Sequence, residues 1–375
     1  MINPKDFYEL LNTVGIEFFT GVPDSLLKDF CAYLIDHSQK DNNIIAANEG
    51  GAIGLASGYH LATGKVPFIY MQNSGIGNAV NPLLSLAAPE VYSIPMLLMI
   101  GWRGEPGIKD EPQHVKQGLV TLDLFKAMQI PYEILPTELE GAKEVLDRAL
   151  IYLNKNKAPF ALIVRNGTFD SYKLDNVVKT DFDMSREEAI KAIVDLLDDN
   201  DIVVSTTGMI SRELFEYREK LGQSHERDFL TVGSMGHASQ IAIGIALKKP
   251  GRKVYCFDGD GAVIMHTGSM GIIGDLAPVN FRQIVFNNGA HDSVGGQPTI
   301  GHSADFNMIA KAFNYKCVST VQTFYDLNVE FNKMKSCDGP GFFEIHVNKG
   351  SRKDLGRPTS TPQENKKALM ENLKK

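Results

Sequence analysis

The stretch Lys253-Val254-Tyr255-Cys256-Phe257-Asp258-Gly259-Asp260-Gly261 decides the fold, because a short apolar run leads directly into a turn of glycine and aspartate. A run of this length that is bounded by turn residues predicts a buried parallel strand. The glycines on both sides of Asp260 let the backbone turn sharply and approach a ligand closely. Further along the chain a second predicted strand, residues 283–286, ends at Asn287-Asn288-Gly289-Ala290.

These two turns contain the ligand types that Mg²⁺ prefers. Asp260 offers a carboxylate oxygen, and an asparagine amide oxygen and a backbone carbonyl from the second turn would add to it, with a diphosphate supplying the remaining oxygens. An EF-hand is excluded, because the loop position that needs glutamate, counted from Asp258, holds Ser269. Neither GxGxxG nor GxxxxGK[ST] fits this stretch. The order strand, GDG turn, helix, strand, NN turn therefore predicts a metal-bound diphosphate site.

Both halves of the chain alternate predicted strands with helical patterns, which is typical of α/β domains built on parallel sheets. A weak internal repeat relates Ala52–Gly58, and the strand that ends at Gly75, to Ile241–Ala246 and the strand that ends at Gly261, which lies 186 residues after Gly75. We therefore predict two similar, doubly wound parallel-sheet domains, residues 1–175 and 185–375. The buried strands are predicted at residues 44–47, 66–71, 96–101, 160–164, 202–205, 253–257, 283–286 and 342–347.

The predicted boundary is the polar segment 168–185, which lacks apolar periodicity. It ends at a capping box, Ser185 to Glu188, that opens the next helix. Two more capping boxes are predicted at Thr137 to Glu140 and at Thr361 to Glu364, the latter with proline at the first helical position.

Composition narrows the class of protein. A chain of 375 residues with 43% hydrophobic and 22% charged residues predicts a soluble protein of two domains. The net charge of −7 and the lack of a basic stripe argue against a nucleic-acid partner. The most apolar stretch, residues 93–102, is too short to span a membrane, and residues 1–6 show no signal-peptide pattern, so we expect a cytoplasmic protein. The cysteines lie far apart without a CxxC pair, which argues against a zinc site and a disulfide framework: Cys31, Cys256, Cys317 and Cys337.

The spacing of the two turns resembles the thiamine-diphosphate signature of pyruvate- and benzoylformate-decarboxylase-like enzymes. The resemblance implies that Asp260, Asn288 and the carbonyl of Ala290 bind the metal, Mg²⁺. The separation in that family is usually one residue shorter, so Asn287 is an alternative ligand. The larger family members insert a third domain between the halves, for which this chain has no room.

The same resemblance implies further cofactor contacts. Thr206, Thr207 and Gly208 would receive the diphosphate, Met235 would hold the cofactor bent between its two rings, and the Gly233 carbonyl would face the aminopyrimidine. The other implied cofactor contacts are Gln72, Asn73, Gly259, Asp260, Gly261, Ala262 and Asn288.

Glu49 follows a predicted strand and stands alone among small residues, whose apolar surroundings would raise its pKa. Thiamine chemistry needs a protein carboxylate that hydrogen-bonds the pyrimidine ring, so that the cofactor can lose its thiazolium proton and form the ylide. The resemblance assigns this role to Glu49. It also implies active sites that lie between subunits, and therefore a homodimer or a higher homo-oligomer.

Across its full length the chain resembles the branch of this family that decarboxylates phosphonopyruvate and sulfopyruvate. The resemblance is carried by residues 21–25, 72–78, 101–107, 110–114, 288–299 and 350–358. It implies conversion of 3-phosphonopyruvate, a small polyanionic 2-oxo acid, to phosphonoacetaldehyde and CO₂. Ser25 would face the substrate, Asp24, Ser25 or His114 would transfer a proton, and basic loop residues would neutralise the acid groups. These basic residues are Arg103, His114, Arg352, Lys353 and Arg357.

Three alternatives stay open. Sulfopyruvate differs only in its acid group; the enzyme that uses it is often split into two subunits, so a single chain favours phosphonopyruvate. Carboligation is a possible side reaction. A non-catalytic cofactor-binding regulator is the alternative from another class, but such proteins normally lose the glutamate or the metal aspartate, and this chain has both Glu49 and Asp260.

Overall fold

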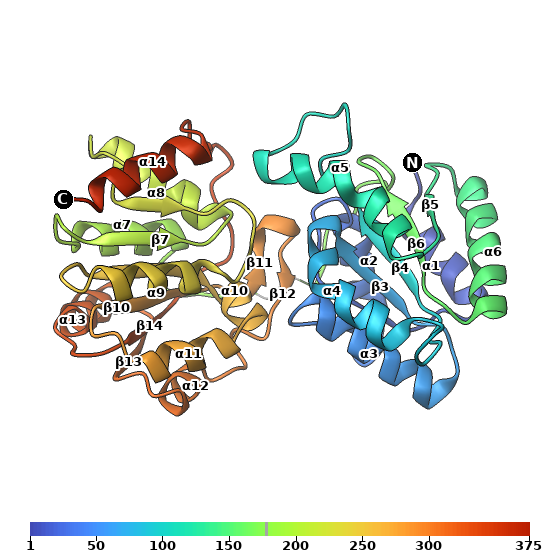
Figure 1. The fold of residues 1–375 in the computed structure, drawn as a ribbon, viewed down its shortest axis with the longest axis horizontal. Helices are drawn as coiled ribbons and strands as arrows, with labels where there is room; N and C mark the ends of the chain where they lie inside the picture. Colours follow the sequence, from blue (N-terminus) through green and yellow to red (C-terminus); the bar gives the residue numbers. More distant parts are fainter. Residues whose placement is uncertain (177–178) are drawn as a thin grey trace. The chain divides into compact units, whose positions relative to one another are not determined.

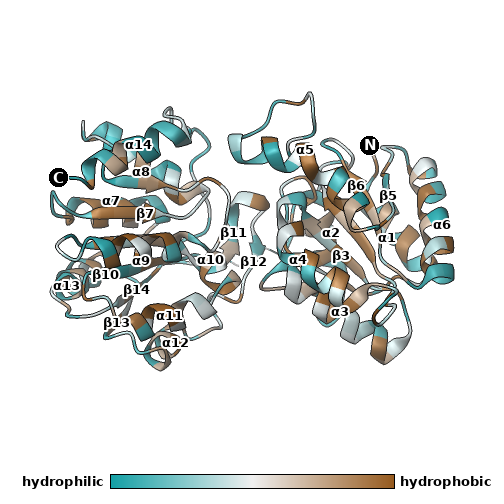
Figure 2. Cartoon of the chain, viewed as in Figure 1, coloured by the Kyte–Doolittle hydropathy of each residue, from teal (hydrophilic) through white to brown (hydrophobic). Residues whose placement is uncertain are grey.

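The computed structural model describes residues 1–176 and 179–375, and the chain forms two compact units, Met1–Val177 and Val178–Lys375 (Figure 1). Each unit contains a six-stranded parallel sheet with two hydrophobic cores, one on each face. Figure 2 shows apolar colour along strands such as β6 and β7 and polar colour on outer helices such as α14. Within the described ranges, no helix combines the length and apolar character needed to cross a membrane.

The sheet of the first unit has the order β2-β1-β3-β4-β6-β5. Its strands are β1 (Phe19–Gly21), β2 (Asn43–Ile45), β3 (Phe68–Gln72), β4 (Leu97–Gly101), β5 (Tyr132–Ile134) and β6 (Phe160–Val164). Its helices are α1 (Pro4–Thr13), α2 (Lys28–His37), α3 (Glu49–Thr63), α4 (Ile76–Pro82), α5 (Pro112–Ala127) and α6 (Leu139–Asn156).

The sheet of the second unit has the order β13-β14-β10-β9-β7-β8. Its strands are β7 (Ile202–Ser205), β8 (Asp228–Leu230), β9 (Val254–Gly259), β10 (Phe281–Asn287), β13 (Cys317–Val321) and β14 (Gly341–His346), and β11 (Ala290–His291) pairs with β12 (Gln297–Pro298) in a separate hairpin. Its helices are α7 (Arg186–Asp195), α8 (Met209–Lys220), α9 (Ala238–Lys248), α10 (Asp260–Met265), α11 (Gly268–Leu276), α12 (Phe306–Ala312), α13 (Phe324–Lys335) and α14 (Pro362–Asn372).

The two sheets have the same topology, which confirms the predicted fold of two similar doubly wound units. Read from the other edge, the second order is β8-β7-β9-β10-β14-β13, and it matches the first order strand for strand. In each unit the chain passes from the first strand to a neighbour on one side and then crosses to build the rest of the sheet on the other side. The strand order therefore reverses between β1 and β3 in the first unit and between β7 and β9 in the second. Ligands of such sheets bind at this reversal, outside the carboxyl ends of the strands.

Every strand predicted from the sequence is present, with its ends shifted by a few residues at most. The missed strands β1, β5 and β8 have only three residues each, and β13 is half-buried and contains serine and threonine, so none gives a clear apolar pattern. The capping boxes at Ser185 and Thr361 are confirmed. The one at Thr137 is wrong, because the helix begins at Leu139 and Glu138 occupies the N-cap without a side-chain cap.

The cysteine spacing suggested no disulfide framework, but the structure joins Cys317 to Cys337, with their Cα atoms 6.3 Å apart. Cys317 begins β13 and is in register with Gly341, the first residue of β14. The segment that precedes β14 therefore returns to the start of β13. Because this proximity depends on how two strands pair, the separation of the cysteines in sequence does not reveal it.

Candidate active site

Glu49 is the first residue of α3, and its carboxyl group is buried at the edge of the first sheet, with the residue only 6% exposed. Asn78 of α4 donates a hydrogen bond of 2.7 Å to its Oε2 atom. Burial raises the pKa of Glu49, and the hydrogen bond from Asn78 opposes that shift only in part. Gly75 makes the position possible, because a Cβ atom at residue 75 would overlap the carboxyl group of Glu49.

Asp24 is fully buried just beyond the carboxyl end of β1. Its Oδ1 accepts a hydrogen bond of 2.6 Å from Gln72 Nε2, and its Oδ2 accepts one of 3.0 Å from the Leu26 amide. Burial raises the pKa of Asp24, while the bond from Gln72 and the charge of Arg103 lower it. The Gln72 amide is fixed in turn, because its Oε1 accepts from Ser74. Asp24 and Gln72 therefore lie together where the strand order reverses between β1 and β3.

Arg103, Asp110 and His114 form a second group at the carboxyl end of β4. Arg103 donates to both carboxylate oxygens of Asp110, and its Nη1 donates a bond of 2.6 Å to Ser25 Oγ. His114 Nδ1 lies 2.9 Å from Asp110 Oδ1. The structure thus brings together three of the predicted substrate residues, Ser25, Arg103 and His114. The carboxylate that links two of them, Asp110, was given no role by the sequence.

Asn73, a predicted cofactor contact, is hydrogen-bonded on all sides within the first unit. Its Nδ2 donates to the Arg103 carbonyl and to Thr121 Oγ1, each at 2.8 Å, and its Oδ1 accepts from the Arg103 amide at 3.2 Å. Both donors and the acceptor of this buried amide are therefore used within the protein. The geometry supports a clamp on the Arg103 backbone and leaves cofactor contact by the Asn73 side chain as a prediction.

In the second unit, Asp260 is the first residue of α10 and is buried. Burial raises its pKa to about 6, and a hydrogen bond that Thr299 Oγ1 donates to Oδ2 works in the opposite direction. A Cβ atom at Gly301 would lie 2.5 Å from Asp260 Oδ2 and also 2.5 Å from Asn287 Oδ1. The two oxygens therefore lie close together against the Cα atom of Gly301, where a larger residue would displace them.

The two candidate asparagines point in different directions. Asn287 donates to the Gly301 carbonyl and to Glu344, and its Oδ1, which lies near Asp260 Oδ2, accepts from the Gly289 amide at 3.1 Å. Asn288 donates to Asp292 at 2.7 Å, and its Oδ1 accepts from the Ala290 amide at 3.1 Å. Each asparagine oxygen thus has one backbone donor, and the two differ in that only Asn287 Oδ1 is placed beside Asp260 Oδ2.

The loop that follows β8 carries Gly233 and Met235. The Gly233 amide donates to Thr207 Oγ1 at 3.0 Å, which ties this loop to the end of β7. A Cβ atom at Gly261 would lie 3.1 Å from the Met235 methyl carbon, so the Met235 side chain reaches the turn that begins α10. Ala262, in the first turn of α10, is buried.

Thr206, Thr207 and Gly208 lead from β7 into α8. Gly208 is the N-cap, has a φ of +96°, and offers no side-chain cap to the helix. The first amides of α8 are therefore not capped by the N-cap side chain, and such amides attract anions such as phosphate. Thr206 is buried, and its amide donates to the Phe257 carbonyl of β9.

Asp258 lies two residues before Asp260 and is also buried, with a pKa that burial raises to about 6. Its Oδ2 accepts from Gln283 Nε2 at 3.3 Å, whereas its Oδ1 has no hydrogen-bond partner among the described residues. A buried acceptor without a partner is costly and is often completed by a ligand or water. This acceptor, without a partner among the described residues, lies in β9 directly before the GDG turn.

The predicted basic residues at 352–357 belong to the second unit, whereas Arg103 belongs to the first. Arg352 contacts three carboxylates, those of Glu187, Glu216 and Asp354. Lys353 and Arg357 are exposed. Because these three carboxylates outnumber the single charge of Arg352, a substrate anion would meet net negative charge there, and the predicted role of Arg352 stays a prediction.

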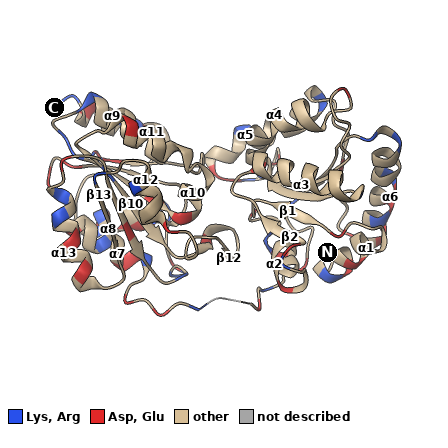
Figure 3. Cartoon of the chain, turned by 90° about the horizontal axis from the view of Figure 1, so that it is seen from below, with Lys and Arg blue, Asp and Glu red and all other residues tan. Residues whose placement is uncertain are grey.

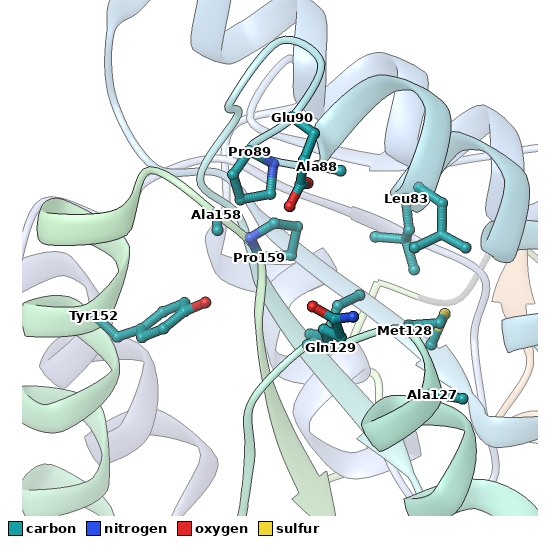
Figure 4. Close-up of a pocket in the computed structure, with 12 residues that line it drawn as sticks. Leu83, Ala88, Pro89, Glu90, Ala127, Met128, Gln129, Tyr152, Ala158 and Pro159 are labelled. Atoms are coloured by element: carbon teal, nitrogen blue, oxygen red, sulfur yellow. The ribbon is translucent and has the colours of Figure 1, made fainter.

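A cavity of about 360 Å³ lies elsewhere in the first unit (Figure 4). Its lining comes from segments that precede β4, β5 and β6, and it includes Leu83, Glu90, Met128, Gln129, Tyr152 and Pro159. Because the strands are parallel, this cavity lies at their amino ends. It is therefore on the opposite edge of the sheet from Glu49, Asp24 and Arg103.

Comparison with known proteins agrees with the site. Residues 5–126 match the N-terminal thiamine pyrophosphate binding domain of thiamine pyrophosphate enzymes, and residues 206–345 match the C-terminal one. The chain belongs to this family of thiamine-diphosphate-dependent enzymes.

Within the family, its relatives are decarboxylases of acidic 2-oxo acids. The chain is 32% identical to phosphonopyruvate decarboxylase of Streptomyces hygroscopicus over 97% of its own length and 92% of the relative. It is 31% identical to the phosphonopyruvate decarboxylase of Streptomyces viridochromogenes over 97% and 93% of the two chains. Sulfopyruvate decarboxylase of Methanosarcina acetivorans is 26% identical over 100% of this chain and 98% of that one.

Proposed function

We propose that this thiamine-diphosphate-dependent decarboxylase converts 3-phosphonopyruvate to phosphonoacetaldehyde and CO₂. The bond between the carboxylate and the keto carbon breaks, CO₂ leaves, and one proton is added to the former keto carbon. The observation that carries the proposal is the fixed Arg103 guanidinium beside Ser25 and His114, since it offers charge to a second acid group. The match to phosphonopyruvate decarboxylases over nearly the whole chain supports it.

Thiamine diphosphate, when bound, supplies the carbon nucleophile and the electron sink for this reaction. Glu49 holds or shares a proton at its buried carboxyl group, which is the role expected of the group that contacts the pyrimidine ring. Asp24 is buried next to Ser25 in the chain and within the influence of the Arg103 charge, and its raised pKa suits it to deliver the proton that completes the aldehyde.

The second unit would hold the diphosphate and its metal. The residues fit such a group, because Asp260 and Asn287 place two buried oxygens close together and Asp258 Oδ1 has no hydrogen-bond partner among the described residues. Mg²⁺ takes oxygen ligands of this kind. The uncapped start of α8 at Gly208 suits the diphosphate. We propose Asp260 and Asn287 as metal ligands, with Asn288 and the Ala290 carbonyl as the alternative set.

Sulfopyruvate is the second candidate substrate, because the Methanosarcina acetivorans relative matches this chain from end to end. That relative is a single chain, so the presence of both units in one polypeptide does not separate the two substrates. Both substrates carry a second anionic group that Arg103 would meet. The choice between them rests on sequence similarity, which favours the phosphonate.

We also propose a homo-oligomer. Glu49 is the only charged residue of α3, which is tan along its length in Figure 3 and leaves Leu55 40% and Leu61 74% exposed. A helix with an uncharged outer face is suited to burial against another subunit. Light scattering should give a mass of at least twice 41.3 kDa; a monomer at micromolar concentration would contradict the proposal.

The decisive test is release of CO₂ from phosphonopyruvate, sulfopyruvate and pyruvate, with and without Mg²⁺ and thiamine diphosphate. We expect the highest kcat/KM with phosphonopyruvate and no release without the cofactor. Higher kcat/KM with sulfopyruvate would select the alternative substrate. No release from any 2-oxo acid would select the non-catalytic regulator.

A further inference from the structure

One carboxylate organises the loop between β4 and α5, which stands out from its unit in Figure 1. Asp110 accepts from Arg103 Nε and from the Gly104 amide, each at 2.8 Å, and from the Glu111 amide at 2.7 Å. Arg103 Nη2 and His114 Nδ1 also contact its Oδ1. No other side chain of the first unit is described with so many hydrogen bonds, and all of them converge from one loop and the first turn of α5.

The charge of Asp110 is maintained by these contacts. Partial burial works to raise its pKa, but the hydrogen bonds from Arg103 and His114 outweigh burial and hold the pKa well below its usual value. The carboxylate is therefore ionised at any pH at which the protein works. An ionised acceptor in two-point contact with a guanidinium fixes the plane of that group as well as its position.

Arg103 is held from two other directions. Asn73 clamps its backbone through both the amide and the carbonyl, and Ser25 Oγ accepts from Nη1. A guanidinium has five N–H donors, and the contacts with Asp110 and Ser25 use three of them. The two that these contacts do not use, one on Nη1 and one on Nη2, remain for an acid group of the substrate.

We infer that Asp110 is the positioning residue that presents Arg103 and His114 together as a preformed receptor for the second acid group of the substrate. Side chains that are fixed before binding lose less entropy when they engage a ligand. The carboxylate does not touch the substrate, since its oxygens are occupied by the two side chains that it holds. This inference rests on the proposed function, because it assigns a receptor to the acid group that distinguishes phosphonopyruvate from pyruvate.

The test is Asp110→Asn, which keeps the shape of the side chain and removes its charge. Asp123→Asn is the matched control, because Asp123 lies on the same helix, is exposed and pairs only with Lys126 in the described contacts. Binding of 3-phosphonopropanoate, which lacks the keto group and cannot react, is measured by calorimetry in the protein loaded with Mg²⁺ and thiamine diphosphate. We expect the Kd to rise at least tenfold in Asp110→Asn and less than twofold in Asp123→Asn.

Kinetics supply the readout that a general structural defect would not give. For phosphonopyruvate we expect KM to rise at least tenfold with kcat within threefold, while the affinity for thiamine diphosphate stays within twofold. An unchanged Kd for 3-phosphonopropanoate would overturn the inference, and so would a fall in kcat with KM unchanged. If Asp110→Asn does not fold, Arg103→Lys takes its place, because lysine keeps the charge but cannot contact Asp110 and Ser25 at once; normal binding in that variant would also overturn it.

The two proposals can fail separately. If the wild-type protein binds 3-phosphonopropanoate and Asp110→Asn weakens that binding, yet no CO₂ is released from phosphonopyruvate, the proposed reaction is wrong and the positioning role stands. If phosphonopyruvate is decarboxylated and Asp110→Asn binds the analogue normally, the reaction stands and the positioning role is wrong.

Discussion

The carboxyl group of Glu49 lies directly over the Cα atom of Gly75, so closely that even a methyl group at residue 75 would overlap it. Glu49 begins α3, whereas Gly75 ends the 3₁₀ turn that follows β3. The position of the acid is thus set by the lack of a side chain on a neighbouring segment. Burial at this position also gives the carboxyl group its raised pKa.

Gly75→Ala should therefore displace Glu49 and lower kcat/KM by about a hundredfold, the order of loss expected when a catalytic group moves by about 1 Å. Overpacking should also lower the free energy of unfolding by about 1–3 kcal/mol. Gly77→Ala is the matched control, because a Cβ atom at Gly77 would meet nothing within 4 Å. Steady-state kinetics and thermal unfolding of both variants check this; equal kinetic effects in the two would contradict it.

Glu49→Gln should lower kcat by about 10²–10⁴, the range by which a positioned acid or base usually contributes. The amide has nearly the same size, so the fold and the binding of thiamine diphosphate should persist. Cofactor affinity, measured by fluorescence quenching, distinguishes a loss of turnover with the cofactor bound from a loss of the cofactor itself. Turnover close to that of the wild type would remove Glu49 from the reaction.

Binding of Mg²⁺ should weaken as the pH falls below about 6. Burial raises the pKa of Asp260 from 3.8 to about 6, so the proton competes with the metal over a range in which an exposed aspartate would already be ionised. The metal binds only the deprotonated form of Asp260, so protonation weakens binding. Below pH 6 the Kd for Mg²⁺ should therefore rise about tenfold for each pH unit. Calorimetric titration with Mg²⁺ between pH 5 and 8 measures it, and a constant Kd would contradict the assignment.

Substitution of Asn287 and of Asn288 should weaken Mg²⁺ binding to different extents. Asn287→Ala removes the amide oxygen that lies close to Asp260 Oδ2, so we expect the Kd for Mg²⁺ to rise at least tenfold. Asn288→Ala removes an amide that is bonded to Asp292, so the effect on Mg²⁺ should be smaller, below about threefold. The same titration at pH 7.5 compares them. The reverse order would restore Asn288 as the ligand.

The two arginines should also differ. Arg103→Ala should raise the KM for phosphonopyruvate by about 10–100-fold, since a charge-assisted contact contributes about 1.5–3 kcal/mol. Arg352→Ala should change the KM by less than about threefold, because Arg352 already contacts Glu187, Glu216 and Asp354. Initial rates over a range of substrate concentrations check both. A large KM effect in Arg352→Ala would show that these ion pairs open during binding.

The sequence predicted the parts of the site that have a local signature. The GDG turn after β9 is visible because an apolar run precedes it, and Glu49 is visible because small residues surround it. The strands β3, β4 and β6 could be predicted because buried parallel strands are apolar on both faces and therefore form continuous apolar runs in the sequence.

The partners of these residues could not be predicted, because they come from other segments. Asn78 reaches Glu49 from α4, and Thr299 reaches Asp260 from the segment after β12. Asp110 is one acid in a polar loop and gains its role only when Arg103 and His114 fold onto it. For Asn73 the family resemblance implied a cofactor contact, and only the structure shows its bonds to the Arg103 backbone.

The shared strand order allows corresponding residues of the two units to be compared. Gly75 and Gly261 follow equivalent strands, β3 and β9, so Ser74 has the place in one unit that Asp260 has in the other. The buried acid that begins a helix therefore has different places in the two units: Glu49 follows β2 in the first, whereas Asp260 follows β9, the counterpart of β3, in the second. The two units share a strand order but not the positions of their acids, so a duplication that preserved the sheet would have left the side chains at its carboxyl ends free to diverge.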